Sequence, residues 1–207
     1  MSIHSLVQSL LALDSSQIFW FITRSSGIMA YLLLWLSTAY GLAVSSKIFD
    51  PFLNRNHTYD FHEFLSLLSI GFLAVHVTVL LFDHFTPFTL IQVLFPFISS
   101  YRPLWVGIGI IAAYSTILVT VTFYLRKRIG MGAFRSIHLL SFLAFFGAAV
   151  HGLFAGTDSS LSSMVIVYEV STLSVVFLTV YWLFVTVQGK RHSHKQAQQS
   201  HLGKTSV

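Results

Sequence analysis

Five long apolar runs constrain this chain more than any other feature. They cover about residues 18–45, 61–82, 104–125, 134–155 and 164–187. Each run is at least as long as the roughly 20 residues that cross the hydrocarbon core of a bilayer as a helix. Lipid offers no hydrogen bonds to the backbone, and none of the runs alternates with the period of two that is typical of a barrel strand. The sequence therefore predicts an all-α membrane protein, built as a bundle of five transmembrane helices.

The composition agrees with a membrane protein and narrows the chemistry. Only 9% of the residues are charged, whereas a soluble domain has about 25%. The net charge of +5 does not indicate nucleic-acid binding, because the basic residues flank the apolar runs and form no single patch. The chain has no cysteine, which excludes disulfides, thiol nucleophiles and cysteine-ligated iron–sulfur clusters. Any metal would be bound by nitrogen or oxygen.

The basic residues also predict the orientation. Only Arg24 and Arg102 fall on the side of the N-terminus. The other Lys and Arg residues fall on the opposite side: Lys47, Arg55, Arg126, Lys127, Arg128, Arg135, Lys190, Arg191, Lys195 and Lys204. The positive-inside rule then places the N-terminus outside and the C-terminus in the cytoplasm, in a cell membrane that we expect to be the inner membrane of a bacterium.

Three regions follow from this arrangement. Residues 1–17 are expected to form an interfacial segment on the outside, and 18–187 the transmembrane domain. The basic residues 188–207 are expected to form a disordered cytoplasmic tail. The connection 83–103 is apolar, aromatic and interrupted by proline, and is expected to lie on the outer interface without crossing.

Four histidines form two pairs within the predicted bundle. His62 and His76 lie on the second predicted helix, and His138 and His151 lie on the fourth, which runs parallel to it. The spacings of 14 and 13 residues separate the members of each pair by about 20 Å along the helix. His62 is therefore level with His138, and His76 with His151. Two imidazoles at one depth are the axial ligands of a six-coordinate haem iron, so the sequence predicts two stacked haem b sites between helices two and four.

Helical phase qualifies this prediction. A spacing of 14 returns to within about 40° of the same face, but a spacing of 13 leaves a residue about 140° away. We therefore expect the fourth helix to be overwound or bent, with Gly147 as the candidate position, or to approach the haems obliquely. His57 and His84 are alternative ligands if the register of the second helix slips. A lone membrane histidine more often hydrogen-bonds another helix, but four at matched depths favour haem.

Charged residues near the ends of the helices suit the carboxylates of a haem. Arg24, inside the first helix, is assigned to the propionate or substrate region of the outer haem, because an intramembrane arginine is costly and usually functional. Arg102 marks the outer interface and is a second candidate there. Arg135 and the run 126–128 are candidates for the inner propionates and for attracting an anionic partner. Glu169 is expected to be buried in the outer half of the fifth helix, either as a proton relay or as a protonated, hydrogen-bonded carboxyl.

A resemblance to a known family rests on several short motifs. They are Arg24-Ser25-Ser26-Gly27, the His62/His76 pair, Ser100-Tyr101-Arg102-Pro103-Leu104-Trp105, Arg135-Ser136-Ile137-His138, and His151-Gly152-Leu153-Phe154-Ala155-Gly156-Thr157-Asp158. The chain resembles the ferric reductase-like transmembrane domain of ferric reductases, NADPH oxidases and the haem subunit of bacterial methionine sulfoxide reductase systems. The resemblance implies electron transfer from reduced nicotinamide, through flavin and two b haems, to an acceptor at the outer face.

The chain also departs from the full-length oxidases of that family. No glycine-rich nucleotide fingerprint follows the fifth run, so flavin or nicotinamide is expected only through a partner. The expected donor is a separate cytoplasmic or membrane-bound flavin-containing reductase, or a quinol. The outer acceptor stays open among a ferric chelate, oxygen, a quinone and a periplasmic protein. Two other functions stay open: a haem-binding subunit or sensor without its own turnover, and a small proton-coupled transporter that uses the histidines and Glu169.

Overall fold

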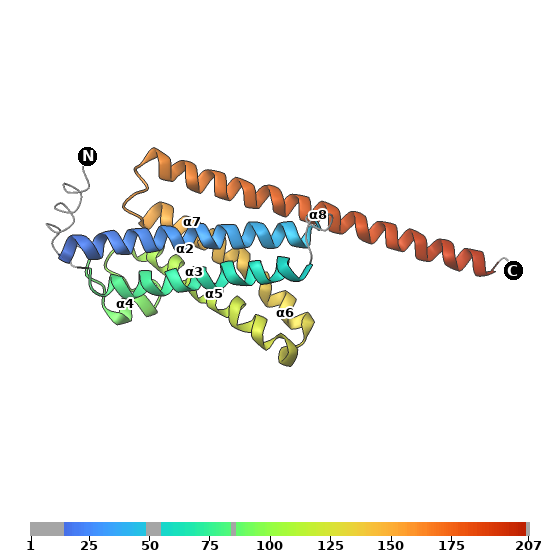
Figure 1. The fold of residues 1–207 in the computed structure, drawn as a ribbon, viewed down its shortest axis with the longest axis horizontal. Helices are drawn as coiled ribbons and strands as arrows, with labels where there is room; N and C mark the ends of the chain where they lie inside the picture. Colours follow the sequence, from blue (N-terminus) through green and yellow to red (C-terminus); the bar gives the residue numbers. More distant parts are fainter. Residues whose placement is uncertain (1–14, 49–54, 84–85, 206–207) are drawn as a thin grey trace.

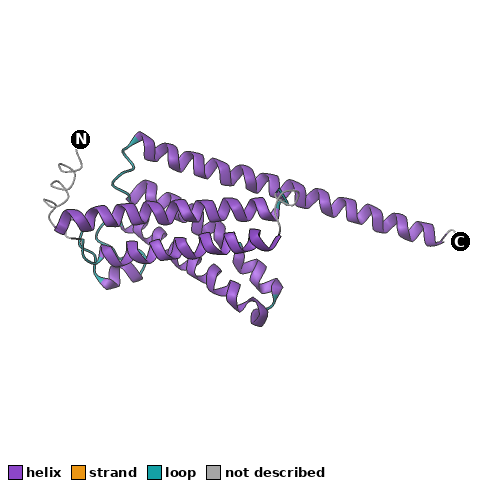
Figure 2. Ribbon diagram, in the orientation of Figure 1, coloured by secondary structure: helices purple, strands orange, loops and turns teal. Residues whose placement is uncertain are grey.

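The computed structural model describes residues 15–48, 55–83 and 86–205 of the 207-residue chain. This part of the chain is all-helical, with 84% helix and no strand (Figures 1 and 2). Its helices are α2 (Ser15–Ser45), α3 (Arg55–Leu80), α4 (Leu90–Leu94), α5 (Pro103–Ile129), α6 (Met131–His138), α7 (Leu140–Ala155) and α8 (Ser162–Thr205). The predicted N-terminal interfacial segment falls mainly on residues 1–14, outside the described residues.

Five helical segments are long and apolar enough to cross a membrane, and they match the five predicted runs. They are Gln17–Ser45, His57–Leu80, Pro103–Ile129, Met131–Ala155 and Ser162–Gly189. Large apolar side chains cover the outside of the bundle, among them Leu173 and Phe177 on α8, which are 68% and 69% exposed. A continuous apolar surface of this kind faces hydrocarbon in a membrane protein. The chain is therefore an all-α integral membrane protein, as predicted.

The bundle is built from two helical hairpins and one peripheral helix. Helix α2 packs on α3, and α5 packs on α7, while α8 lies along α2 and α7 at the edge (Figure 1). Between them, Tyr31, Phe145, Tyr168 and Val175 form a buried apolar cluster. The ring of Tyr31 lies 6.0 Å from that of Phe145 and 4.9 Å from that of Tyr168, between centroids. This cluster holds α2, α7 and α8 together.

The connection between α3 and α5 does not cross the membrane, in agreement with the sequence. Its described residues, 81–83 and 86–102, contain one short helix, α4, which begins with a reciprocal capping box of Thr89 and Gln92. The connection folds back onto α5, where the ring of Phe97 covers Gly107 so closely that a Cβ there would lie 2.3 Å from it. The hydroxyl of Tyr114 on α5 donates to the carbonyl of Leu94. These contacts close the end of the bundle where α2 begins (Figure 1).

The fourth spanning segment is interrupted near His138, where helical phase had favoured overwinding, a bend or an oblique approach. Helix α6 ends at His138 and α7 begins at Leu140. The N–H of Phe142 donates to the carbonyl of Leu139 at 3.1 Å, a three-residue turn that winds by about 120° per residue. This overwinding turns His138 relative to His151. The expected position at Gly147 is wrong, because Gly147 lies within α7 and serves close packing on Ala112 of α5.

Two other expectations need correction. The tail was expected to be disordered from residue 188, but α8 continues to Thr205. Residues 190–202 contain no glycine or proline, and six of these 13 residues are Lys, Arg or Gln, which favour a helix. Glu169 was expected to be buried, but its side chain is exposed on α8. Hydropathy gives the depth of a residue and not the side it faces, and α8 turns Tyr168 and Ser171 toward the bundle instead.

Candidate functional site

A large cavity lies between the two hairpins at the end where α2 begins. It has a volume of about 530 Å³, and both His76 of α3 and His151 of α7 line it. This volume lies within the range of about 300–1,000 Å³ that small-molecule and cofactor pockets occupy. Arg24, Thr86 and Asp158 lie along the same cavity. The outer pair of histidines predicted from depth therefore lines one cavity, which we call the outer cavity.

Each histidine of the outer cavity is oriented by a backbone carbonyl of a neighbouring helix. Nδ1 of His76 lies 2.8 Å from the carbonyl oxygen of Thr23 on α2, and Nδ1 of His151 lies 2.9 Å from that of Trp105 on α5. A carbonyl oxygen only accepts hydrogen bonds, so Nδ1 carries the proton in both rings. In the neutral imidazole, Nε2 then keeps its lone pair. This is how proteins orient histidines that bind a metal.

A glycine beside each imidazole makes these contacts possible. Gly27 lies four residues after the accepting carbonyl on α2, and Gly109 lies four residues after the one on α5. A Cβ at Gly27 would lie 2.9 Å from Nδ1 of His76, and a Cβ at Gly109 would lie 2.4 Å from Nδ1 of His151. The absent side chains let the rings reach the helix backbone. This role of Gly27 and Gly109 was not predicted from the sequence.

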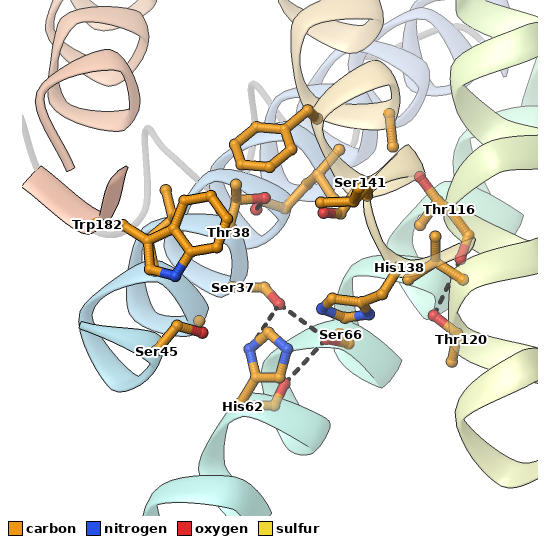
Figure 3. Close-up of a pocket in the computed structure, with 17 residues that line it drawn as sticks. Ser37, Thr38, Ser45, His62, Ser66, Thr116, Thr120, His138, Ser141 and Trp182 are labelled. Atoms are coloured by element: carbon orange, nitrogen blue, oxygen red, sulfur yellow. Dashed lines mark hydrogen bonds between the residues drawn. The ribbon is translucent and has the colours of Figure 1, made fainter. Parts of the chain in front are cut away.

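A smaller cavity of about 130 Å³ contains the second pair, and we call it the inner cavity. His62 and His138 point toward one another across it (Figure 3). Their ring centroids are 6.3 Å apart with an interplanar angle of 69°. Two metal–nitrogen bonds of about 2 Å, with each ring centre roughly 1 Å further out, give a separation of about 6 Å. The pair is therefore spaced as two imidazoles on one metal ion would be, although the cavity is narrow.

A closed ring of hydrogen bonds orients His62 (Figure 3). The Ser66 hydroxyl donates to the carbonyl of His62 at 2.9 Å, and it lies 2.7 Å from the Ser37 hydroxyl. With the Ser66 proton used in this way, the Ser37 hydroxyl donates to Ser66 and accepts from Nδ1 of His62, 3.3 Å away. Gly41 again provides the space, since a Cβ there would lie 2.9 Å from the His62 ring. His62 therefore also carries its proton on Nδ1.

His138 is the exception among the four histidines. Its Nδ1 is buried and has no hydrogen-bond partner among the residues that the structure describes. On α5, the position 14 residues after Gly109 is occupied by Phe123, not by a glycine. The ring of Phe134 lies 5.3 Å from the ring of His138 and 6.2 Å from that of Phe123, between centroids. The Phe134 ring thus packs against His138, whereas His76 and His151 meet backbone carbonyls and His62 meets the Ser37 hydroxyl.

The arginines assigned to the outer level have protein partners. Arg24 forms an ion pair with Asp158, and its guanidinium lies 3.9 Å from the centre of the Trp20 ring. Arg102 has a left-handed backbone conformation and donates to the carbonyl of Phe154. Arg24 thus lies at the outer cavity as predicted, while Arg102 holds the C-terminal end of α7, the helix that carries His151.

The remaining candidates lie away from both cavities. Arg135 is exposed on α6, and His57 is exposed at the start of α3. Neither residue is among those that line the outer or the inner cavity. His84 lies outside the described residues. The structure therefore brings together the four predicted histidines and Arg24, and it leaves Arg135 at the surface.

The donor set restricts what the two cavities can bind. Within residues 15–48, 55–83 and 86–205, no group of three or more His, Asp or Glu side chains is placed to bind a metal ion. Each level instead offers two imidazoles, which suits a metal whose other ligands come from a macrocycle. Comparison with protein-family models, curated proteins and solved structures finds no match to this chain.

Proposed function

We propose that this protein is a membrane-spanning b-type cytochrome, the electron-transfer module of an oxidoreductase of the ferric reductase-like kind. One observation carries the proposal: two levels of paired imidazoles lie between the same two hairpins, and three of the four rings are held with Nε2 free. The glycines beside His62, His76 and His151 let each ring reach the acceptor that fixes its proton on Nδ1. A metal ligand does require such an orientation.

In this proposal, His76 and His151 hold the outer haem and His62 and His138 the inner one. A haem between two imidazoles exchanges single electrons without binding substrate at its iron. The cradles at Gly27 and Gly109, the volume of the outer cavity and its two nitrogen donors fit this group at the outer level. At the inner level the ring separation of 6.3 Å fits it, but the cavity measures only about 130 Å³. Arg24 is the cation at the outer level, and Asp158 neutralises it within the protein.

The direction of electron flow follows from the basic end of the bundle. The last turn of α5 carries Arg126, Lys127 and Arg128, which the positive-inside rule assigns to the cytoplasm. A cationic inner face attracts an anionic donor, so a separate flavin-containing reductase or a quinol supplies the electrons there. The acceptor is reduced at the outer face, beside Arg24 and Asp158.

The haem content of the purified protein tests the proposal. Protein from haem-replete cells should contain about two haems b per chain by the pyridine haemochrome assay, with low-spin spectra. His76→Ala and His151→Ala should each lose one of the two haems. The matched control is His57→Ala, which removes an exposed histidine of α3 and should lose none.

Several outcomes would contradict the proposal or redirect it. A colourless protein from such cells would refute the cytochrome and favour a transporter. Haem that dithionite reduces but no acceptor reoxidises would favour a sensor. Reduction by NADPH without any partner or added flavin would refute the separate donor.

A further inference from the structure

Glu169 lies on the outward side of α8, where a single chain offers it no partner. Its side chain is exposed, and among the residues that the structure describes none forms a hydrogen bond or an ion pair with it. The spanning segment that begins at Ser162 has 28 residues, so it is about 42 Å long and extends about 6 Å beyond the hydrocarbon layer at each end. Glu169 stands about 10 Å from its start. The carboxyl group therefore lies at the depth of the lipid tails.

This position is unusual for an ionisable side chain. Such residues within membrane segments almost always face the interior of a bundle or a polar cavity, because lipid gives them nothing to pair with. The two basic residues towards the same end of the bundle are already engaged. Arg24 pairs with Asp158, and Arg102 donates to the carbonyl of Phe154. A partner for Glu169 must therefore come from another molecule.

The opposite side of α8 is already used for packing within the chain. Tyr168, Ser171 and Val175 face the bundle and are only 8%, 1% and 0% exposed. Helix α8 lies at the edge of the bundle, so no other helix of the chain covers its outward side (Figure 1). That side is open to a second protein along the whole spanning segment.

The outward side of α8 repeats with a period of seven residues. One row consists of Ile166, Leu173, Val180 and Val187, and three residues after the first three of these stand Glu169, Val176 and Leu183. The apolar members are 43–68% exposed. Positions a and d of a parallel coiled coil repeat in this way, and left-handed pairs of membrane helices pack with the same geometry. We call these seven residues the α8 seam.

A second copy of the chain is the occupant that the seam fits. In a dimer with a twofold axis along the membrane normal, the two α8 helices are parallel and each seam residue meets its own copy at the same depth. A carboxyl group that keeps its proton has one O–H donor and acceptor oxygens, so two of them can hydrogen-bond to each other. A single polar position on such a seam also fixes the register of the two helices.

We propose that the α8 seam is the interface of a homodimer, in which the two Glu169 carboxyl groups hydrogen-bond to each other within the lipid layer. The inference goes beyond the proposed electron transfer and does not depend on haem. Each chain keeps its own outer and inner cavities between its two hairpins, on opposite sides of the paired α8 helices.

Cysteine cross-linking in native membranes tests the interface, because the unmodified chain has no cysteine. Val180→Cys and Leu183→Cys place single thiols on the seam. Tyr181→Cys is the matched control, since Tyr181 is 39% exposed but lies more than 90° around the helix from both seam positions. Mild oxidation should convert the two seam variants into covalent dimers and leave the control largely monomeric.

Substitution of Glu169 tests the role of the carboxyl group. Association of the full-length chain is measured in mixed micelles by Förster transfer between donor and acceptor dyes attached at Ser160→Cys. Glu169→Leu should weaken association by about 3- to 30-fold, the range expected for loss of an interhelical hydrogen bond. Glu169→Gln keeps a donor and an acceptor and should associate nearly as tightly as the unmodified chain.

Three results would overturn the inference. If neither seam variant cross-links, the seam faces lipid or a helix of another protein. Equal cross-linking of all three cysteine variants would indicate random collision. Unchanged association of Glu169→Leu would show that the carboxyl group has no part in the interface. Neither experiment measures haem, so the homodimer and the proposed function can fail independently.

Discussion

Three of the four imidazoles owe their orientation to a neighbouring helix that lacks a side chain at the point of contact. A Cβ at Gly27, Gly41 or Gly109 would lie within 3.0 Å of a histidine ring atom, a separation at which the ring must move. At this scale a single methyl group decides whether Nδ1 reaches its acceptor. The glycines are therefore as necessary to the site as the histidines themselves.

Gly109→Ala is the sharpest test of this requirement. The new methyl group would lie 2.4 Å from Nδ1 of His151 and would push the ring from the Trp105 carbonyl. We expect the variant to lose most of the outer haem, measured as a fall from about two haems per chain to about one.

Gly71→Ala is the matched control, because Gly71 lies within a spanning helix and a Cβ there meets nothing within 4 Å. It should keep its haem, and removing a helical glycine should stabilise the protein by up to about 1 kcal/mol. Equal haem contents in the two alanine variants would show that the glycine cradle has no role.

The sequence predicted which histidines share a level, but not what holds them. Depth depends only on the helical rise and on the order of the spans, so His62, His76, His138 and His151 could be placed from their numbers alone. The acceptor of each Nδ1 depends on how α2 fits against α3, which no single helix encodes. A usable signal did exist: Gly27 and Gly41 have the same spacing as His62 and His76.

At the scale of helices, α8 is attached to α2 by hydrogen bonds in addition to the buried apolar cluster of Tyr31, Phe145, Tyr168 and Val175. The Tyr31 hydroxyl is hydrogen-bonded to that of Ser171 in the buried interior, and the Trp35 indole donates to Ser174 at 2.8 Å, nearly one turn further along. Lipid removes most of the hydrophobic drive for two helices to associate, so packing and hydrogen bonds must supply it. Helix α8 is therefore the element that the bundle would release first.

Tyr31→Phe should loosen this attachment. Ser171 donates to the Tyr168 carbonyl at 3.1 Å, so the tyrosine proton goes to Ser171, and its loss leaves that oxygen short of a donor. We expect a destabilisation of about 0.6 to 1.7 kcal/mol, measured by unfolding in mixed micelles with increasing dodecyl sulfate.

Tyr181→Phe removes a hydroxyl from the outward-facing side of the same helix, where the side chain is 39% exposed. It should change the unfolding midpoint little. The interpretation fails if both phenylalanine variants unfold alike.

The interruption of the fourth span shows what helix-level reasoning can and cannot predict. The phase of a 13-residue spacing favoured a helix that is overwound, bent or oblique between His138 and His151, and the structure contains a three-residue turn there. Its position could not be deduced, because glycine is only one way to relax a helix. The turn lies at Leu139, immediately after the histidine that it reorients. Likewise, polar composition predicted a disordered tail, although the same residues favour a helix once α8 leads into them.

At the scale of the whole molecule, the number of membrane-spanning helices was the property that the sequence predicted best. The fold itself does not determine which end of the bundle faces the cytoplasm. The bundle would look the same with either end in the cytoplasm, so only the distribution of Lys and Arg distinguishes the two ends. Ser160, between α7 and α8, marks one end of the bundle, and Lys127, in the last turn of α5, marks the other. Both side chains are exposed.

The absence of cysteine makes this orientation directly measurable. A membrane-impermeant maleimide added to intact cells should label Ser160→Cys, whereas Lys127→Cys should react only after the membrane is opened. The unmodified chain, which has no thiol, is the negative control. Equal labelling of the two cysteine variants after permeabilisation shows that both thiols are accessible. The reverse pattern would place the C-terminus outside and reverse the direction of electron flow proposed above.

One contrast between the two sides of the bundle affects how electrons would cross it. His62 and His76 stand on one unbroken helix, so about 21 Å of helical rise separates them whatever the surrounding bundle does. Their counterparts stand on α6 and α7, which are separated by the break at Leu139. Helix α3 thus fixes the distance between His62 and His76 along its axis, whereas α6 and α7 can shift relative to one another. A change in how these helices pack would alter the distance across each histidine pair, while the distance between the two levels stayed constant.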